Sequence, residues 1–142
     1  MIQNLSKSNI KDILSLQETA NFTDGWTESM LNSAFENRYF ALGTFMDGEL
    51  VAFIGVDANM FEYEIECVLV HPLYRKKGLA RNLVEKSIDL AKQQGVESIL
   101  LEVRKSNFSA IKLYESVGFI PISERKKYYA DGEDAIVYKK EI

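Results

Sequence analysis

The sequence predicts an α/β fold with one central sheet, and three observations lead to this prediction. Strand-like and helix-like segments follow one another in the order β-α-α-β-β-β-α-β-α-β-β. A buried strand at 67–70 leads through a short basic loop into an amphipathic helix at 78–94. The length of 142 residues suits one domain with a substantial core. We therefore expect a single domain over residues 1–142, with about seven strands and about four helices.

The first elements are predicted by apolar spacing and by capping residues. Residues 2–5 are expected to form a short strand, and Ser8 is placed to cap the helix that follows. That helix ends near residue 20 and has four apolar residues at helical spacing: Ile10, Ile13, Leu14 and Leu16. Thr27 is placed to cap a second helix that reaches about residue 37.

The middle of the chain predicts three strands. Residues 39–46 and 50–56 alternate in polarity, and Asp47-Gly48 between them is a strong signal for a tight hairpin turn. Residues 63–70 begin polar and end in a nearly continuous apolar run, which suits a central strand. His71-Pro72 ends that strand, because proline has no N–H to donate to a sheet.

Three glutamates around the start of this strand share one parity, so we expect them on one face: Glu62, Glu64 and Glu66. An acidic row of this kind suits a cationic acceptor amine. An equally weighted alternative is that the row is the solvated face of an edge strand.

The last part of the chain predicts a buried strand, a short helix and two closing strands. Residues 98–103 suit the buried strand. Ser106 and Asn107 are capping residues for a helix near 108–117, which Gly118 ends. The closing strands are expected at 119–129 and 135–141, joined by a turn at 130–132.

The basic loop before the central helix predicts an anion-binding site. The first turn of a helix has backbone N–H groups without intrahelical partners and a partial positive charge. Gly78 lets a phosphate approach the backbone, and Ala80 is too small to block it. Four basic side chains lie nearby: Arg75, Lys76, Lys77 and Arg81. On spacing alone, a diphosphate seated on residues 76–81 and a solvated loop that merely connects strand to helix are equally favoured.

The motifs resemble the GNAT family of N-acetyltransferases. R-K-K-G-L-A at 75–80 is similar to that family's acetyl-coenzyme A loop, and V-H-P before it and N-x-x-A-x-x-L-Y-x-x-x-G-F at 107–119 fit the same family. The resemblance implies a mixed sheet, acetyl-CoA as cosubstrate and no metal. It places the coenzyme on ten residues: Val68, Leu69, Val70, Lys76, Lys77, Gly78, Leu79, Ala80, Arg81 and Asn107. The first three would act through their backbone, where the strand separates from the next one, and Asn107 is alternatively a plain helix cap.

A closer resemblance, over most of the chain, is to the bacterial RimI enzymes, which acetylate the N-terminal amine of a small-subunit ribosomal protein. It rests on L-E-V-R-K-S-N at 101–107, R-K-K-Y-Y at 125–129 and D-G-E-D-A-I at 131–136. RimI enzymes usually have Pro-Trp where this chain has Gly25-Trp26, so we expect a looser loop here. Trp26 either lines the acceptor pocket or closes the core.

Two residues are candidates for proton transfer. Glu102 interrupts the buried run I-L-L-E-V, where an unpaired carboxylate is costly, so it has either a partner or a function. From the residues alone, Glu102 is equally favoured as a general base and as the partner of Arg104 or another cation in an ion pair. The resemblance implies that it is the base. The resemblance also implies that Tyr114 protonates the leaving thiolate, although the residues alone favour a core tyrosine. Tyr128 and Tyr129 are weaker candidates for the peptide channel, because paired aromatics on a strand usually pack.

Composition limits the partners. The net charge of −4 argues against nucleic acid as a partner. No apolar segment is long enough to cross a membrane and no signal-peptide pattern begins the chain, so we expect a cytoplasmic protein. We also expect a monomer or a weak dimer. Cys67 is the one cysteine and is expected to be a small buried hydrophobe, and the one histidine, His71, is expected to be structural.

No Ser-His-Asp or Cys-His constellation is apparent, so direct attack by an amine is favoured over a covalent acyl-enzyme. The expected reaction is transfer of acetyl from acetyl-CoA to a protein N-terminal α-amine. The resemblance implies the N-terminal alanine of small-subunit ribosomal protein S-eighteen as the substrate. Two alternatives stay open: a GNAT enzyme that acts on lysine or a small amine, with Glu66 as its base, and a non-catalytic acyl-CoA-binding module.

Overall fold

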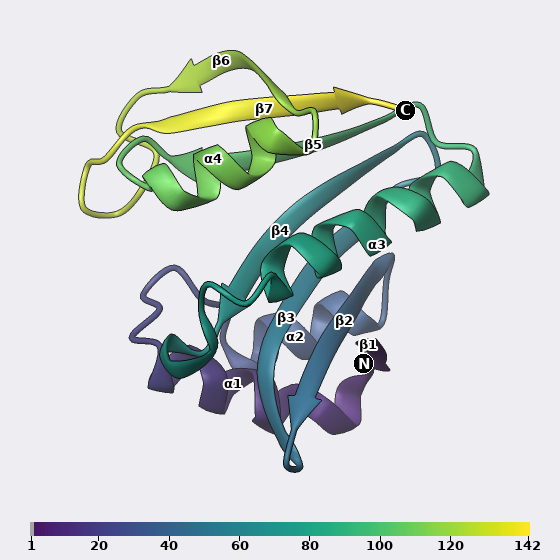
Figure 1. Cartoon of the computed structure of the whole chain (residues 1–142), viewed down its shortest axis with the longest axis vertical. Coiled ribbons are helices and arrows are strands. Elements are labelled where there is room, and N and C mark those ends of the chain that lie inside the picture. The colour runs from purple at the N-terminus through teal and green to yellow at the C-terminus, as the bar shows by residue number, and fades with distance from the viewer. Residues whose placement is uncertain (1) are drawn as a thin grey trace.

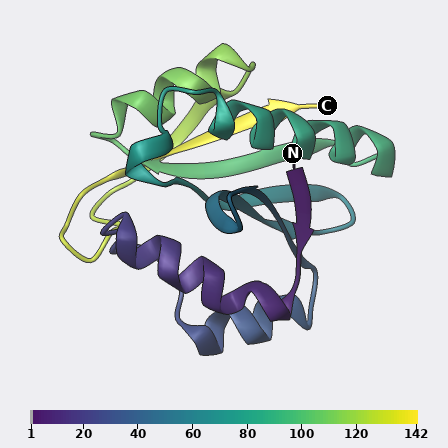
Figure 2. The same cartoon turned by 60° about the horizontal axis from the view of Figure 1, so that its bottom comes forward.

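A computed structural model describes residues 2–142, which form a mixed sheet with helices on both faces (Figure 2). The strands are β1 (Ile2–Leu5), β2 (Tyr39–Met46), β3 (Glu49–Ala58), β4 (Glu62–Val70), β5 (Ser98–Arg104), β6 (Ile120–Arg125) and β7 (Ala135–Glu141). The helices are α1 (Ile10–Thr19), α2 (Glu28–Phe35), α3 (Leu79–Gln94) and α4 (Phe108–Ser116), with 3-10 turns η1 (Lys7–Asn9) and η2 (Pro72–Tyr74). The predicted order of seven strands and four helices is confirmed.

The sheet has the strand order β1-β2-β3-β4-β5-β7-β6. Across the described chain, the pair β4–β5 is parallel and the other neighbouring pairs are antiparallel. The parallel pairing is short, since Glu62–Ile65 pair with Ser98–Leu101 and the two strands then diverge (Figure 1). A wedge therefore opens between residues 66–70 of β4 and residues 102–104 of β5.

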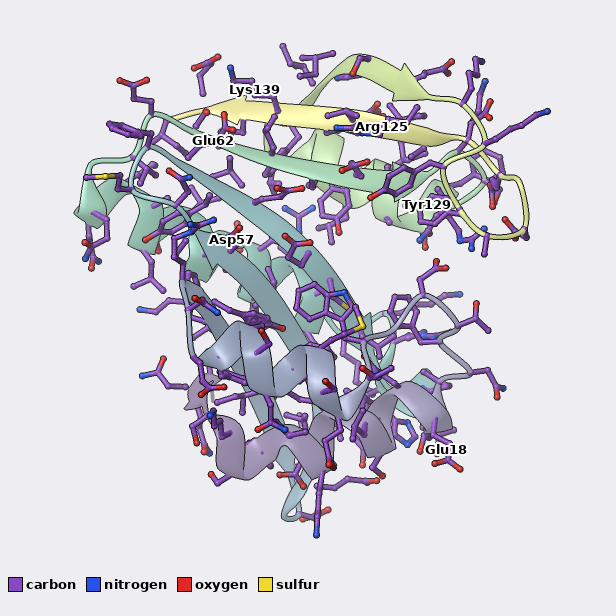
Figure 3. All side chains as sticks on the ribbon, turned by 180° about the vertical axis from the view of Figure 1, so that it is seen from behind. Glu18, Asp57, Glu62, Arg125, Tyr129 and Lys139 are labelled. Atoms are coloured by element: carbon purple, nitrogen blue, oxygen red, sulfur yellow. The ribbon has the colours of Figure 1, made fainter. Side chains whose placement is uncertain are left out.

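Two layers of helix enclose the sheet. Helices α3 and α4 lie on one face, and α1 and α2 lie on the other (Figure 2). The core under α3 includes Leu83 and Val84, and the core under α1 includes Ile13 and Phe53, all of them fully buried. Helices α1 and α2 do not extend across the whole sheet, so the β5–β7–β6 part of that face is left uncovered (Figure 3).

The start of α1 differs from the prediction. The N-cap of α1 is Asn9 rather than Ser8, and its side chain makes no capping hydrogen bond to α1. Ser6 instead caps the 3-10 turn η1: the Ser6 side chain accepts a hydrogen bond from the Ser8 N–H, and the Asn9 side chain accepts one from the Ser6 N–H at 3.0 Å. This reciprocal pair satisfies two free donors at the start of the 3-10 turn that leads into α1. The predicted cap at Thr27 is confirmed, because its side chain accepts from the Met30 N–H at 3.2 Å.

The sixth strand is shorter than predicted. It ends at Arg125, opposite Ala135, and Lys127 then takes a left-handed conformation with φ of 51°. The Lys127 N–H donates to the Asp134 carboxylate at 2.9 Å, which turns the chain away from the sheet. Tyr128 and Tyr129 therefore lie in the β6–β7 loop and not on a strand, so the reason given above for treating them as packing residues does not apply.

The place of β4 settles one of the alternatives left by the sequence. It is the fourth of seven strands, paired with β3 along its length, so the acidic row is not on an edge strand. The strand also ends where His71-Pro72 predicted. None of the helices in residues 2–142 has both the length and the apolar character needed to span a membrane.

Candidate active site

The wedge between β4 and β5 is the centre of a cleft of about 410 Å³. Its lining comes from four regions of the chain. These are the α1–α2 loop (Phe22, Asp24, Trp26), β4 (Glu64–Val68), β5 with the start and middle of α4 (Leu101–Arg104, Asn107, Ala110, Tyr114), and the β6–β7 loop (Tyr128–Ala130). The cleft thus brings together the predicted residues Glu102, Tyr114, Asn107 and Val68. Leu69 and Val70 lie outside its lining, and Leu69 is buried in the core.

The predicted anion loop lies at the N-terminus of α3. Lys76 and Gly78 both have positive φ, 64° and 81°, and a Cβ built on Gly78 meets nothing within 4 Å. No side chain caps the first turn of α3, so its leading N–H groups stay available to an anion. Lys76 and Lys77 are exposed beside it. The backbone of this loop therefore fits a diphosphate.

The other two basic residues of the loop are engaged with the protein. Arg75 donates from Nε to the Val70 carbonyl at 3.2 Å, at the end of β4. Arg81 donates from Nη2 to the Ser116 hydroxyl at 2.6 Å, which links the first turn of α3 to the last turn of α4. Arg81 keeps its charge next to the helix N-terminus, whereas Arg75 is folded back onto the sheet.

Glu102 lies on β5 with its side chain only 16% exposed. Arg125 Nε lies 2.8 Å from its Oε2, so Arg125, and not Arg104, is the cation that pairs with it. The guanidinium N–H is not directed at that oxygen, and the buried Oε2 has no hydrogen-bond partner among the described residues. The negative charge of the carboxylate is therefore balanced by Arg125, but its Oε2 is still free to accept a hydrogen bond from a bound group.

Tyr114 lies on the inner face of α4 and is 6% exposed. Its ring meets that of Phe119 edge-on, at 5.8 Å between centroids. Burial raises the pKa of the Tyr114 phenol well above its usual value, with smaller contributions from Cys67 and Tyr129. The phenol is therefore protonated at neutral pH, and the raised pKa makes it a weaker acid than an ordinary tyrosine.

Asn107 begins α4, and its side-chain oxygen accepts the Ala110 N–H at 3.3 Å. The helix-cap alternative is thus present in the structure, and the same residue also lines the cleft. His71 lies outside the cleft lining, 9% exposed, and its Nδ1 accepts the Leu73 N–H at 3.1 Å. Cys67 is partly buried: it packs against the core under α1, and it also lines the cleft, which was not expected.

Glu66 occupies a β-bulge. Gly55 pairs with Cys67 and Val56 with Ile65, so Glu66 has no partner on β3. Glu66 is exposed as a residue, yet desolvation of its carboxyl in the cleft, together with the nearby charges of Glu64, Asp57 and Glu102, raises its pKa to about 7. Sequence parity alone did not show this bulge.

This raised pKa predicts a pH-dependent stability. Between the ordinary glutamate pKa and about 7, the folded protein binds the proton more tightly than the unfolded chain, so stability falls as pH rises through that window. We expect Glu66→Gln to raise the free energy of unfolding at pH 8, with a smaller gain at pH 5. Urea unfolding at pH 5 and pH 8 measures this free energy, and Glu18→Gln, at an exposed position, is the control. An equal gain at both pH values would contradict the assignment.

The α1–α2 loop is held by Gln17 beside Gly25. Gln17, 9% exposed on α1, donates from Nε2 to the Trp26 carbonyl at 3.0 Å and accepts the Trp26 N–H at 3.1 Å. A Cβ on Gly25 would lie 2.5 Å from the Gln17 amide carbon. Glycine here makes room for this pair of hydrogen bonds, which tie the loop to α1 at Trp26. Trp26 meets both expectations, since it lines the cleft and packs on the core under α1.

We therefore expect Gly25→Ala to lower the free energy of unfolding by about 1–3 kcal/mol, because the new methyl group displaces the buried Gln17 amide from its two hydrogen bonds. Chemical unfolding of Gly25→Ala in the wild-type and Gln17→Ala backgrounds measures the coupling. If the Gln17 amide is the cause, the alanine at 25 costs much less when residue 17 is already alanine. The same cost in both backgrounds would place the cause elsewhere.

Comparisons with known proteins agree with this architecture. The Acetyltransferase (GNAT) family model matches residues 8–119. The chain is 38% identical over 115 residues to the [ribosomal protein bS18]-alanine N-acetyltransferase of Escherichia coli K12, covering 79% of this chain and 78% of that protein. It is 32% identical over 139 residues to a putative enzyme of the same name from Bacillus subtilis, covering 96% and 91%. The crystal structure of the E. coli enzyme matches with a TM-score of 0.92 and 33% identity, over 100% of this chain and 93% of that one.

Proposed function

The chain belongs to the GNAT family of acetyltransferases, and from that premise we propose that it transfers acetyl from acetyl-CoA to the N-terminal α-amine of a protein. The E. coli relative at 38% identity is named for the N-terminal alanine of ribosomal protein bS18, and we propose the same acceptor here. The observation that carries this proposal is the cleft itself. It places a carboxylate and a phenol, Glu102 and Tyr114, at the point where β4 parts from β5.

In the proposed mechanism, the neutral acceptor amine attacks the thioester carbon directly. Glu102, through a water or by contact, takes the proton that the nitrogen loses when the new C–N bond forms. Tyr114 gives its proton to the thiolate that leaves when the C–S bond breaks, and regains a proton from solvent. Backbone N–H groups of residues 68–70 have no strand partner on the β5 side and are candidates to hold the oxyanion.

The coenzyme would be held by the N-terminus of α3 and by residues of the cleft. The free N–H groups at residues 78–81 and the side chains of Lys76 and Lys77 suit the diphosphate, as the family resemblance implies. Arg81 adds charge at the same helix end, and Asn107 is placed at the cleft. Burial raises the pKa of the Cys67 thiol to about 12, so this cysteine is not a thiolate at neutral pH and direct transfer is favoured over an acyl-cysteine.

The acceptor follows from the same chemistry. An α-amine has a pKa of about 7.7–8.0, so roughly a tenth is neutral at pH 7, while a lysine amine with a pKa of about 10.4 is neutral below about one part in a thousand. One carboxylate is enough to deprotonate the α-amine. This difference supports an N-terminal acceptor over a side-chain one.

A second acceptor class, lysine or a small amine, is favoured by one observation. Glu66 lies in the same cleft with a pKa raised to about 7, the range of an effective base at neutral pH. In that case Glu66 and not Glu102 would take the proton.

The test uses the purified protein with acetyl-CoA and a peptide that copies the bS18 N-terminus. The control is the same peptide with its α-amine blocked and its lysines free. We expect acetylation of the free N-terminus alone, measured by mass spectrometry. Acetylation of the blocked peptide would favour the lysine and small-amine class, and turnover on neither peptide nor on a panel of small amines would overturn the proposed activity.

A further inference from the structure

One partly buried cation, Arg104, joins two loops that are far apart in the sequence. Arg104, at the end of β5, has its side chain only 20% exposed. It donates from Nε and Nη2 to the two carboxylate oxygens of Asp24, at 2.7 and 2.8 Å, in the α1–α2 loop. Its Nη1 donates to Asp131 at 2.9 Å and to Glu133 at 2.8 Å, in the β6–β7 loop. Both loops supply lining residues of the cleft.

The geometry of the contact is specific to arginine. A guanidinium has five N–H donors in a fixed planar fork, so one edge can hold Asp24 while the other end reaches Asp131 and Glu133. A lysine has one ammonium group and cannot make both contacts in this arrangement. Without the guanidinium, the three carboxylates that it brings together would repel one another.

The same guanidinium lies on an aromatic residue of the cleft wall. Its carbon is 4.2 Å from the centroid of the Tyr129 ring, and Tyr129 meets Tyr128 edge-on at 5.0 Å. Figure 3 shows Tyr129 in the β6–β7 loop beside the uncovered part of the sheet. Arg104 therefore fixes the position of an aromatic side chain as well as that of two loops.

The network also reaches the start of α4. Glu133 Oε2 accepts the Ser106 N–H at 2.8 Å, one residue before the Asn107 cap. The Glu133 N–H in turn donates to Asp131 at 3.0 Å. A shift of the β6–β7 loop is thus resisted both by Arg104 and by the backbone that carries Asn107.

We propose that Arg104 is a positioning residue that locks the α1–α2 loop to the β6–β7 loop and so sets the spacing of the two walls between which the acceptor peptide binds. The identity of the cleft as the acceptor site rests on the proposed function. Arg104 donates all of these contacts within the protein and acts on the acceptor through Asp24, Tyr129 and the loops that carry them.

The test compares Arg104→Lys and the isosteric Asp24→Asn with Arg38→Lys. Arg38 makes a two-pronged contact with Asp57 at 3.1 and 3.3 Å, but its side chain is 61% exposed and the pair joins no cleft loops, so it is a matched control. Hydrogen–deuterium exchange reports on the amides of residues 21–26 and 127–133. Peptide KM and kcat, and acetyl-CoA affinity by calorimetry, report on the site.

We expect Arg104→Lys to speed exchange in both loops and Asp24→Asn to speed it in the α1–α2 loop. Both variants should raise the peptide KM by about tenfold or more. Acetyl-CoA affinity should stay within about twofold of wild type, and the double variant should be no worse than the poorer single one, because either change breaks the same link. The Arg38 variant should change none of these.

Three results would overturn the proposal: unchanged exchange in the α1–α2 loop, an unchanged peptide KM despite faster exchange, or an equal loss of coenzyme affinity. The last would indicate a general structural role. If the wild-type protein acetylates no peptide, the proposed function fails, and the exchange data still decide whether Arg104 locks the two loops. Asp24→Asn keeps side-chain size and shape, so it answers the question even if Arg104→Lys folds poorly.

Discussion

Replacing Glu102 with glutamine is expected to lower kcat for peptide acetylation by about 10²–10⁴-fold, the range typical of a lost general base. Glutamine keeps the shape of the side chain but cannot take a proton. The peptide KM should change far less than kcat, because the carboxylate is needed in the transition state and not for peptide binding. Steady-state kinetics with the free-N-terminus peptide at pH 7 and pH 9 measures the effect. The deficit should persist at pH 9, because the larger neutral fraction of the α-amine helps both proteins alike and glutamine still cannot take the proton that the nitrogen loses when the C–N bond forms.

The matched variant is Glu66→Gln, in the same cleft and of the same chemistry. We expect it to retain kcat to within about tenfold, well short of the loss of a base. If Glu66→Gln loses the activity while Glu102→Gln keeps it, the base is the bulged carboxylate on β4, and the Glu102–Arg125 pair is structural. Near-normal kcat in both would mean that the amine loses its proton to solvent.

Reversing the charge at Arg81 is expected to weaken acetyl-CoA binding by about ten- to a hundredfold. Arg81→Glu removes a cation and places an anion beside the free N–H groups at the start of α3, where the diphosphate is proposed to lie. Isothermal calorimetry measures the affinity in the absence of an acceptor. High salt should reduce the difference between the two proteins, because exposed charges are screened.

Ser116→Ala provides the control for Arg81. It removes the 2.6 Å hydrogen bond to Arg81 but leaves the charge in place, so a small effect on affinity would show that charge, and not the link between α3 and α4, matters. Unchanged affinity in Arg81→Glu would remove the diphosphate from this loop. A loss of the same size in both variants would assign the effect to the packing of the two helices.

The sequence predicted most of the fold because turn and capping residues set the ends of most helices and strands. Asp47 and Gly48 have φ of 51° and 79°, as a tight hairpin requires, and Thr27 caps α2. The basic loop before α3 was also predictable, since strand, glycine and helix start are consecutive. The structure confirmed that Glu102 is largely buried with a cation, but which cation depended on the pairing of β6 with β7.

The missed features all depend on contacts between distant segments. Arg104 was considered only as a partner for Glu102, yet its carboxylate partners lie 80 and about 28 residues away along the chain. Nothing in residues 21–25 indicates that Asp24 meets this strand. The parity of Glu102 and Arg104 does place both on one face of β5, and that was the one available signal. Likewise, the bulge at Glu66 depends on its register with β3.

The early divergence of β4 from β5 leaves an unpaired edge on each of these two strands, inside the molecule. Unpaired strand edges are where proteins add foreign strands and aggregate. The two outer edges are blunted in ordinary ways: β1 has only four residues, and β6 contains Pro121 and an irregular register with β7. The inner edges have no such protective feature, but they lie in a cleft whose lining includes the two loops that Arg104 joins. A cleft protects a strand edge without the use of charge or proline. The backbone groups of the edge then stay available to a narrow extended substrate, while a whole strand from another molecule is excluded.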